Sequence, residues 1–181
     1  MSTQLHLETQ RLHLRPFTIE DAPRVVQIAG SKEVADTTQA IPHPYCLEDA
    51  KRWLHPQAAD HEEGYLTVWA AVHKEENLVI GAVSLEPNTD YHFAELGYWF
   101  GKDYWNQGFC TEAAQALLKH AFTTLQMNRV QACHLSRNAS SGRVMQKVGM
   151  RYEGTRREAI LKWNIFENVD CYAILKRDYN E

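Results

Sequence analysis

The residue types and their spacing in segment 93–113 say more than any other part of the sequence about the chemistry that the protein could perform. Residues 93–100 predict a strand, and a loop containing Gly108 joins them to a helix predicted from Thr111. A helix start leaves several backbone N–H groups unpaired and carries partial positive charge, and glycine lets a phosphate approach the backbone closely. The segment therefore predicts a cradle for a pyrophosphate, although a glycine before a helix also occurs in ordinary loops.

Several competing motifs are missing from the sequence. There is no GxGxxG fingerprint, and Gly101 and Lys102 are followed by Asp103 rather than by the Ser or Thr of a Walker motif. The nine histidines show no HExxH spacing and the four cysteines no CxxC spacing. We therefore expect neither a dinucleotide-binding Rossmann domain nor a metal site.

The order of several segments resembles one enzyme family. Residues 94–99 with 105–113 resemble the acetyl-CoA-binding core of the GNAT acetyltransferases, and residues 138–150 resemble the second conserved block of the branch that contains the ribosomal-protein N-terminal acetyltransferases (RimJ/RimL-like). The opening residues 9–17 are similar to this branch too, so the resemblance spans nearly the whole chain. The chain departs from the family pattern at Trp105, Cys110 and Met150.

The resemblance implies acetyl-CoA as the co-substrate. It implies that the backbone of residues 96–100 pairs with the pantetheine arm as a further strand would, and that residues 107–111 hold the pyrophosphate. The cofactor-binding residues implied in this way are Leu96, Tyr98, Trp99, Phe100, Gln107, Gly108, Phe109, Cys110, Thr111, Asn138, Ser141 and Lys147.

The resemblance also implies two catalytic residues. Glu95 is the candidate general base, directly or through water, and strand alternation places it on one face with Gly97 and Trp99. A salt-bridged carboxylate at a strand edge is the alternative interpretation of Glu95. Ser141 is the candidate acid that donates to the sulfur of CoA, and it can equally be a capping residue in the first turn of a helix.

The expected activity is transfer of an acetyl group to a primary amine. Deprotonation at pH 7 costs a lysine amine about 4.6 kcal/mol but an α-amine only about 1–1.4 kcal/mol, so an N-terminal substrate needs less help from a base. We expect a protein N-terminal α-amine as the acceptor. The alternatives are a small-molecule amine, such as an antibiotic, polyamine or amino acid, and a non-catalytic module that only binds acyl-CoA.

The elements that must position these residues alternate in a mixed order. We expect strands at residues 9–15, 66–73, 78–85, 93–100, 129–135, 152–158 and 169–175. We expect helices after Thr18, over residues 47–62 with a break or kink at Pro56, over 111–125 and over 140–148. This order predicts a single α/β (α+β) domain over residues 1–181, a GNAT-like three-layer fold with a mixed central sheet of six to seven strands and helices on both faces.

Composition restricts the partners. The formal net charge of −4 argues weakly against nucleic acid, and no apolar run approaches the roughly 20 residues that a membrane helix needs. Residues 1–8 lack the apolar segment of a signal peptide, so we expect a cytoplasmic protein. Residues 40–45, rich in proline, are the candidate acceptor-side loop, and the resemblance suggests a homodimer.

Overall fold

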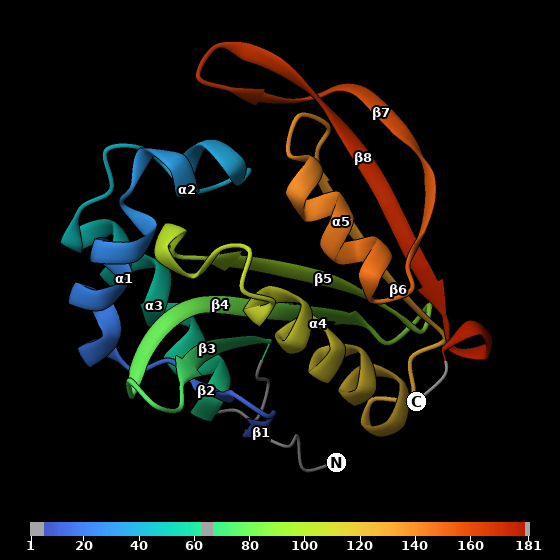
Figure 1. Cartoon of the computed structure of the whole chain (residues 1–181), viewed down its shortest axis with the longest axis horizontal. Helices are drawn as coiled ribbons and strands as arrows, with labels where there is room; N and C mark the ends of the chain where they lie inside the picture. The colour runs from blue at the N-terminus through green and yellow to red at the C-terminus, as the bar shows by residue number, and fades with distance from the viewer. Residues whose placement is uncertain (1–5, 63–66, 180–181) are drawn as a thin grey trace.

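One twisted sheet runs through the molecule (Figure 1). The computed structural model describes residues 6–62 and 67–179. Its eight strands lie in the order β1-β2-β3-β4-β5-β6-β8-β7, and only β5 and β6 are parallel neighbours. The strands are β1 (Leu7–Glu8), β2 (Leu12–Pro16), β3 (Val68–His73), β4 (Leu78–Asn88), β5 (Phe93–Phe100), β6 (Arg129–Leu135), β7 (Arg151–Lys162) and β8 (Ile165–Leu175).

Helices cover both faces of the sheet, which confirms the predicted three-layer fold (Figure 1). One face carries α1 (Ala22–Ala29) and α3 (Leu47–Glu62), with α2 (Lys32–Thr37) beside them, and the other face carries α4 (Phe109–Lys119) and α5 (Ala139–Lys147). The short turns are the 3-10 segments Ile19–Asp21, Lys102–Tyr104 and Lys176–Asp178 and the π-helical segment His120–Thr124.

Strand alternation divides the core into two layers. In β3, Trp69 and Ala71 pack with α4, whereas Ala70 and Val72 pack with α1 and α3. All four side chains are at least nine-tenths buried. A strand that is apolar on both faces lies in the middle of a sheet covered by helices on each side, and this explains why β3 reads as a continuous apolar run.

The parallel pair β5 and β6 stays together over a short distance only. Its register joins Phe93–Glu95 to Arg129–Gln131 and ends there, while β4 continues to pair with β5 as far as Phe100. Beyond Glu95, β5 has a strand neighbour on one edge alone. The sheet is therefore open between β5 and β6 over the segment that the sequence marked for the pantetheine arm.

The structure corrects several predicted elements. The sheet has eight strands rather than six to seven because Leu7–Glu8 adds a short edge strand to β2. α2 was not expected, since it has only six residues, although Ser31 caps it by accepting a hydrogen bond from the Val34 N–H at 3.2 Å. α3 continues through Pro56 rather than breaking there. The predicted start of β3 at Leu66 lies outside the described residues.

α4 also begins earlier than predicted, at Phe109, and its start is tied to the N-terminal hairpin. The Glu112 carboxylate accepts hydrogen bonds from the Arg11 N–H at 2.7 Å, from Arg11 Nε at 2.7 Å and from Thr9 Oγ1 at 2.6 Å. Arg11 Nη1 donates to the Gln107 carbonyl at 2.9 Å, and its guanidinium lies 4.2 Å from the centre of the Phe109 ring. These contacts fix where the helix begins.

Within residues 6–62 and 67–179, no helix is long and apolar enough to cross a membrane.

We predict that Glu112→Gln lowers stability in a pH-dependent way. Burial raises the pKa of Glu112, but hydrogen bonds from Thr9 and Arg11 outweigh it, and the pKa lies below the ordinary 4.5. A carboxylate whose pKa is lowered by folding stabilises the protein at pH values above its unfolded-state pKa. This stabilisation is lost as the pH falls through the folded-state pKa. We expect a loss of about 1–2 kcal/mol at pH 7, measured by urea unfolding, and a smaller further loss on acidification below pH 4.5 than in the wild type.

The exposed turn residue Glu75 supplies the control, because Glu75→Gln makes the same change of charge at a carboxylate that is not bonded to Thr9 or Arg11. We expect its stability to follow that of the wild type at every pH. Parallel pH–stability curves for the wild type and Glu112→Gln would contradict the anchoring role of Glu112.

Candidate acetyl-CoA and acceptor site

The open edge of β5 presents unpaired backbone groups. The Gly101 N–H donates to the Ile80 carbonyl at 2.9 Å, so alternate residues of β5, among them Gly97 and Trp99, direct their backbone groups to β4. The intervening residues Leu96 and Tyr98 direct theirs to the opening, as does Phe100, whose carbonyl accepts from Trp105 Nε1 at 2.7 Å. The Leu96 N–H is used in the parallel pairing of Glu95 with Gln131. The Leu96 carbonyl and the backbone groups of Tyr98 therefore offer the free ladder positions.

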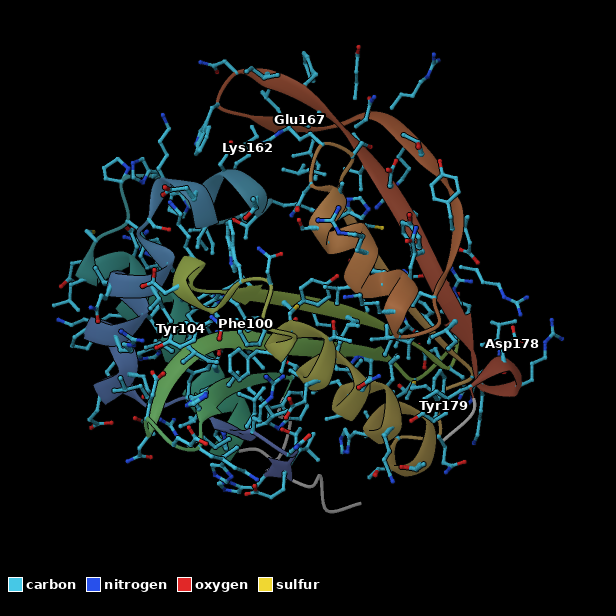
Figure 2. The ribbon with its side chains drawn as sticks, in the orientation of Figure 1. Phe100, Tyr104, Lys162, Glu167, Asp178 and Tyr179 are labelled. Atoms are coloured by element: carbon cyan, nitrogen blue, oxygen red, sulfur yellow. The ribbon has the colours of Figure 1, made fainter. Side chains whose placement is uncertain are left out.

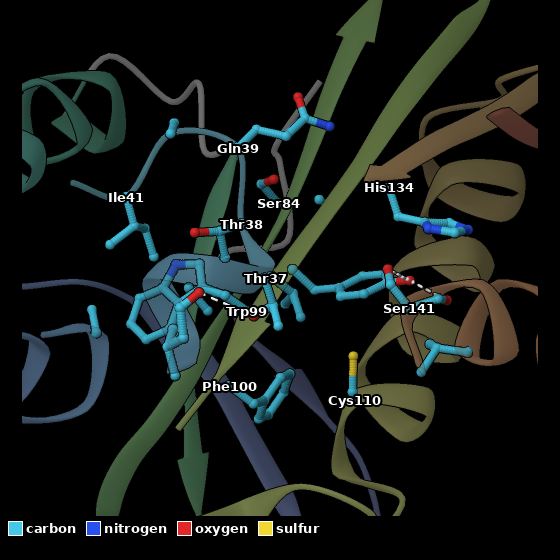
Figure 3. Close-up of a pocket in the computed structure, with 18 of the residues that line it drawn as sticks. Thr37, Thr38, Gln39, Ile41, Ser84, Trp99, Phe100, Cys110, His134 and Ser141 are labelled. Atoms are coloured by element: carbon cyan, nitrogen blue, oxygen red, sulfur yellow. Dashed lines mark hydrogen bonds between the residues drawn. The ribbon is translucent and has the colours of Figure 1, made fainter. Parts of the chain in front are cut away.

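A cavity of about 1130 Å³ passes through the opening. Figure 3 shows Ser141 and Cys110 on one side of β5 and Thr38, Gln39 and Ile41 on the other. Its walls include all predicted cofactor residues of β5 (Leu96, Tyr98, Trp99 and Phe100), the predicted base Glu95, and Gly108, Cys110, Thr111, Asn138, Ser141 and Lys147. Residues separated by up to about 50 positions thus meet in one cavity.

The start of α4 forms one end of this cavity. Gly108 precedes the helix with a φ of 86°, a left-handed conformation that favours glycine, and no side chain caps the helix among the described residues. Two residues of the predicted cradle do not line the cavity: Gln107 donates from Nε2 to the Asp103 carbonyl at 2.7 Å, and Phe109 is buried in the core. Neither side chain therefore contributes to the wall of the cavity.

Glu95 lies on the face of β5 that carries α1 and α3. Its neighbour on this face, Trp99, packs with the core beneath those helices. The Glu95 side chain is exposed and makes no ion pair or hydrogen bond within the described part of the chain. Glu86 of β4 stands directly opposite it in the register. The salt-bridged alternative for Glu95 therefore finds no partner in the structure.

Tyr98 connects β5 to α5. Its hydroxyl lies 3.0 Å from Ser141 Oγ and donates to the Ser141 carbonyl at 3.0 Å. Burial, followed by the nearby Cys110, raises the pKa of Tyr98 well above its usual range, although the bond to Ser141 lowers it. Tyr98 is therefore a neutral hydroxyl that fixes the position of the Ser141 side chain, a link that the sequence alone did not reveal.

The start of α5 is capped by Asn138 rather than by Ser141. Asn138 Oδ1 accepts from the Ser141 N–H at 3.3 Å, and Asn138 Nδ2 donates to the Thr37 carbonyl at 3.1 Å. Asn138 thus holds the end of α2 against the start of α5. Arg143, which the sequence analysis missed, also lines the cavity one helical turn before Lys147, and this four-residue spacing of two cations on one helix could have revealed it.

The predicted acceptor-side loop does reach the cavity. Ile41 and Tyr45 contribute to its wall together with Trp53, whose ring lies 6.0 Å from that of Trp99. Burial, then Asp49 and Cys46, raise the pKa of Tyr45 to about 12, so that Tyr45 is neutral at physiological pH. This end of the cavity is aromatic.

His134, at the end of β6, is a buried wall residue that the sequence analysis did not single out. Its Nδ1 lies 2.8 Å from the Leu135 carbonyl, and its Nε2 has no hydrogen-bond partner among the described residues. Its ring stacks on that of Tyr172 at 5.6 Å. Within the same residues, no group of three or more His, Cys, Asp or Glu side chains is placed to hold a metal ion.

Comparisons with known proteins agree with this geometry. The family model described as "Acetyltransferase (GNAT) domain" matches residues 11–151. An uncharacterized N-acetyltransferase of Bacillus subtilis (strain 168), YnaD, is 31% identical over 97% of this chain and 100% of its own length. The ribosomal-protein-serine acetyltransferase of Escherichia coli (strain K12) is 29% identical over 70% of each chain.

A solved structure gives the same result. The acetyltransferase (GNAT family) from Bacillus anthracis superimposes with a TM-score of 0.83 at 27% identity, covering 95% of this chain and 99% of the other. With a family model that matches most of the chain and a relative that spans nearly all of it, the protein belongs to the GNAT family and is an acetyl-CoA-dependent N-acetyltransferase.

Proposed function

We propose that this protein transfers the acetyl group of acetyl-CoA to the N-terminal α-amine of a protein. The observation that carries the proposal is one continuous cavity between β5 and β6, with Glu95 on one side of the sheet and Ser141 on the other. A donor and an acceptor that enter from opposite faces can meet only at such an opening. Acetyl-CoA supplies an activated thioester, and the chain's own residues orient it and move the protons.

The opening offers contacts for the pantetheine arm and the phosphates of acetyl-CoA. The Leu96 carbonyl and the backbone groups of Tyr98 pair with the amides of the pantetheine arm, and the unpaired N–H groups at the start of α4 bind the pyrophosphate. Gly108 leaves the space that this approach requires. Arg143 and Lys147 on α5 add positive charge beside the phosphates.

Two side chains move the protons. Glu95 accepts a proton from the attacking amine, directly or through a water molecule, because it is exposed and free of ion pairs within the described residues. Nitrogen bonds to the acetyl carbon as the carbon–sulfur bond breaks, and Ser141 donates a proton to the departing thiolate. The Tyr98 hydroxyl, 3.0 Å from Ser141 Oγ, keeps that group in place, and solvent returns the proton to Ser141.

An α-amine suits this site for energetic reasons. Its deprotonation costs about 1–1.4 kcal/mol at pH 7 against about 4.6 kcal/mol for lysine, and the site offers one exposed carboxylate on β5 as the base. The name of the Escherichia coli relative, a ribosomal-protein-serine acetyltransferase, also supports a protein acceptor. A small-molecule amine is the second candidate, favoured by the aromatic wall of Trp53, Trp99 and Tyr45.

We predict that Gly108→Val weakens acetyl-CoA binding at least tenfold, as measured by isothermal titration calorimetry. A branched side chain is strained at a φ of 86°, and its Cβ would lie 3.3 Å from Arg11 Nη2, so it disturbs the start of α4 that would hold the pyrophosphate. The matched control is Gly149→Val, because Gly149 has a φ of 89° but does not line the cavity. Equal affinities in the two variants would contradict a phosphate cradle at α4.

Glu95→Gln should lower kcat about a hundredfold at pH 7. The deficit should shrink as the pH rises above the amine pKa of about 8, because the free amine then needs no base. Glu75→Gln makes the same change of charge at an exposed turn residue that does not line the cavity and should keep the wild-type pH–rate profile. A Glu95→Gln profile that parallels the wild type would remove Glu95 from the role of base.

A panel of acceptors tests the choice of amine. We expect mass spectrometry to detect acetylation of a lysine-free peptide with a free N-terminus. The same peptide with a blocked N-terminus and one added lysine should react far more slowly, as should a polyamine. Preferential acetylation of the polyamine would support the small-molecule alternative, and acetylation of neither peptide would contradict a protein acceptor.

A further inference from the structure

A pair of cysteines faces the acceptor side of the sheet. Cys133 of β6 and Cys171 of β8 stand directly opposite each other in the antiparallel register. The Ser136 N–H donates to the Asn168 carbonyl at 2.9 Å, so Ser136 and Asn168 are a hydrogen-bonded pair. Every second residue of β6 before Ser136 then belongs to a hydrogen-bonded pair as well. Cys133 and Cys171 therefore form a non-hydrogen-bonded pair, in which side chains lie closest and Cα atoms are about 4.5 Å apart.

This placement suits a disulfide. Disulfides join Cα atoms roughly 4.4–6.8 Å apart, and the two free thiols already lie with their Sγ atoms 3.0 Å apart. A bond of about 2.05 Å then requires only a small movement of the two side chains. The remaining cysteines have no such neighbour, since Cys46 Sγ donates to Asp49 instead and Cys110 lies on α4.

The pair is accessible and lies beside a cation. Cys133 and Cys171 are partly exposed and line a cavity of about 510 Å³, together with Glu95 and Gln39. Arg156 Nη2 donates to Cys133 Sγ at 3.0 Å. Burial and then Cys171 raise the pKa of Cys133 to about 12, whereas Arg156 lowers it. The guanidinium is thus the group that favours a thiolate in a site that otherwise disfavours one.

The β7–β8 hairpin contributes to the wall of this cavity. The β7–β8 hairpin, which carries Lys162 and Glu167 near its far end, extends past α5 and away from the body of the molecule (Figures 1 and 2). Arg137, which follows β6, donates to Glu167 and to Asp36 at 2.7 and 2.9 Å. The hairpin is therefore tied to α2 through Arg137, and its residues Arg156 and Ile160 line the same cavity as the cysteine pair.

We propose that Cys133 and Cys171 are a redox-sensitive dithiol that a small disulfide such as oxidised glutathione converts into an intrachain disulfide. One thiolate attacks a sulfur of the reagent, forms a mixed disulfide and releases one glutathione. The second cysteine then attacks the protein sulfur of the mixed disulfide and releases the other glutathione. The protein loses two electrons and two protons, and the reagent is reduced to two thiols. This site goes beyond the acetyl transfer and does not depend on it.

The test is to treat the reduced protein with oxidised glutathione and to count its thiols after denaturation. The count should fall from four to two per chain, and the tryptic fragments 130–137 and 163–176, each with one cysteine of the pair, should run as one linked species until they are reduced. Cys46→Ser is the control and should give the same linked species. A link between two chains, a link to Cys46, or glutathione adducts without the linked species would overturn the proposal.

A second measurement tests whether the Arg156 guanidinium speeds the reaction beyond what two neighbouring thiols would do alone. Arg156→Leu should slow the formation of the linked species severalfold, because it removes the cation beside Cys133. Arg157→Leu makes the same change of charge at the next, exposed position of β7 and should leave the rate unchanged. Equal rates in the two variants would contradict the part assigned to the Arg156 guanidinium.

Discussion

The parting of β5 from β6 after Glu95 is the constraint on which the rest of the structure depends. A parallel pair that continued would satisfy the Leu96 carbonyl and the backbone groups of Tyr98 internally and would close the sheet. Because the pairing ends, these groups keep their hydrogen-bonding capacity in an otherwise buried setting. The opening also joins the two faces of the sheet, so that a ligand held by α4 and α5 can react with one held beside α1 and α3.

Contacts between distant segments keep the opening in shape. Arg11 and Glu112 fix the start of α4, and Tyr98 holds Ser141 from across the gap. At the far side Asn138 links α5 to the end of α2. Each contact satisfies a buried or partly buried polar group, which is costly to leave unpaired. The site is therefore positioned by the same interactions that stabilise the fold around it.

Local patterns in the sequence predicted most of the elements, and most of the residues that the family resemblance implied for the site line the cavity. Strand alternation placed Glu95 and Tyr98 on opposite faces of β5. The helix start after Gly108 was recognisable from one glycine and the apolar periodicity that follows. What could not be predicted is pairing at a distance. Nothing in one sequence indicates that Tyr98 bonds to Ser141 or that Cys133 pairs with Cys171. These contacts arise from the register of whole strands and from the position at which α5 packs on the sheet.

The most direct test of the account is a crystal structure of the protein with acetyl-CoA. The account predicts the pantetheine arm between β5 and β6, its amides bonded to the backbones of Leu96 and Tyr98, the pyrophosphate at Gly108 and the thioester between Glu95 and Ser141. Acetyl-CoA bound elsewhere on the molecule, or bound in the opening with its phosphates away from α4, would contradict it.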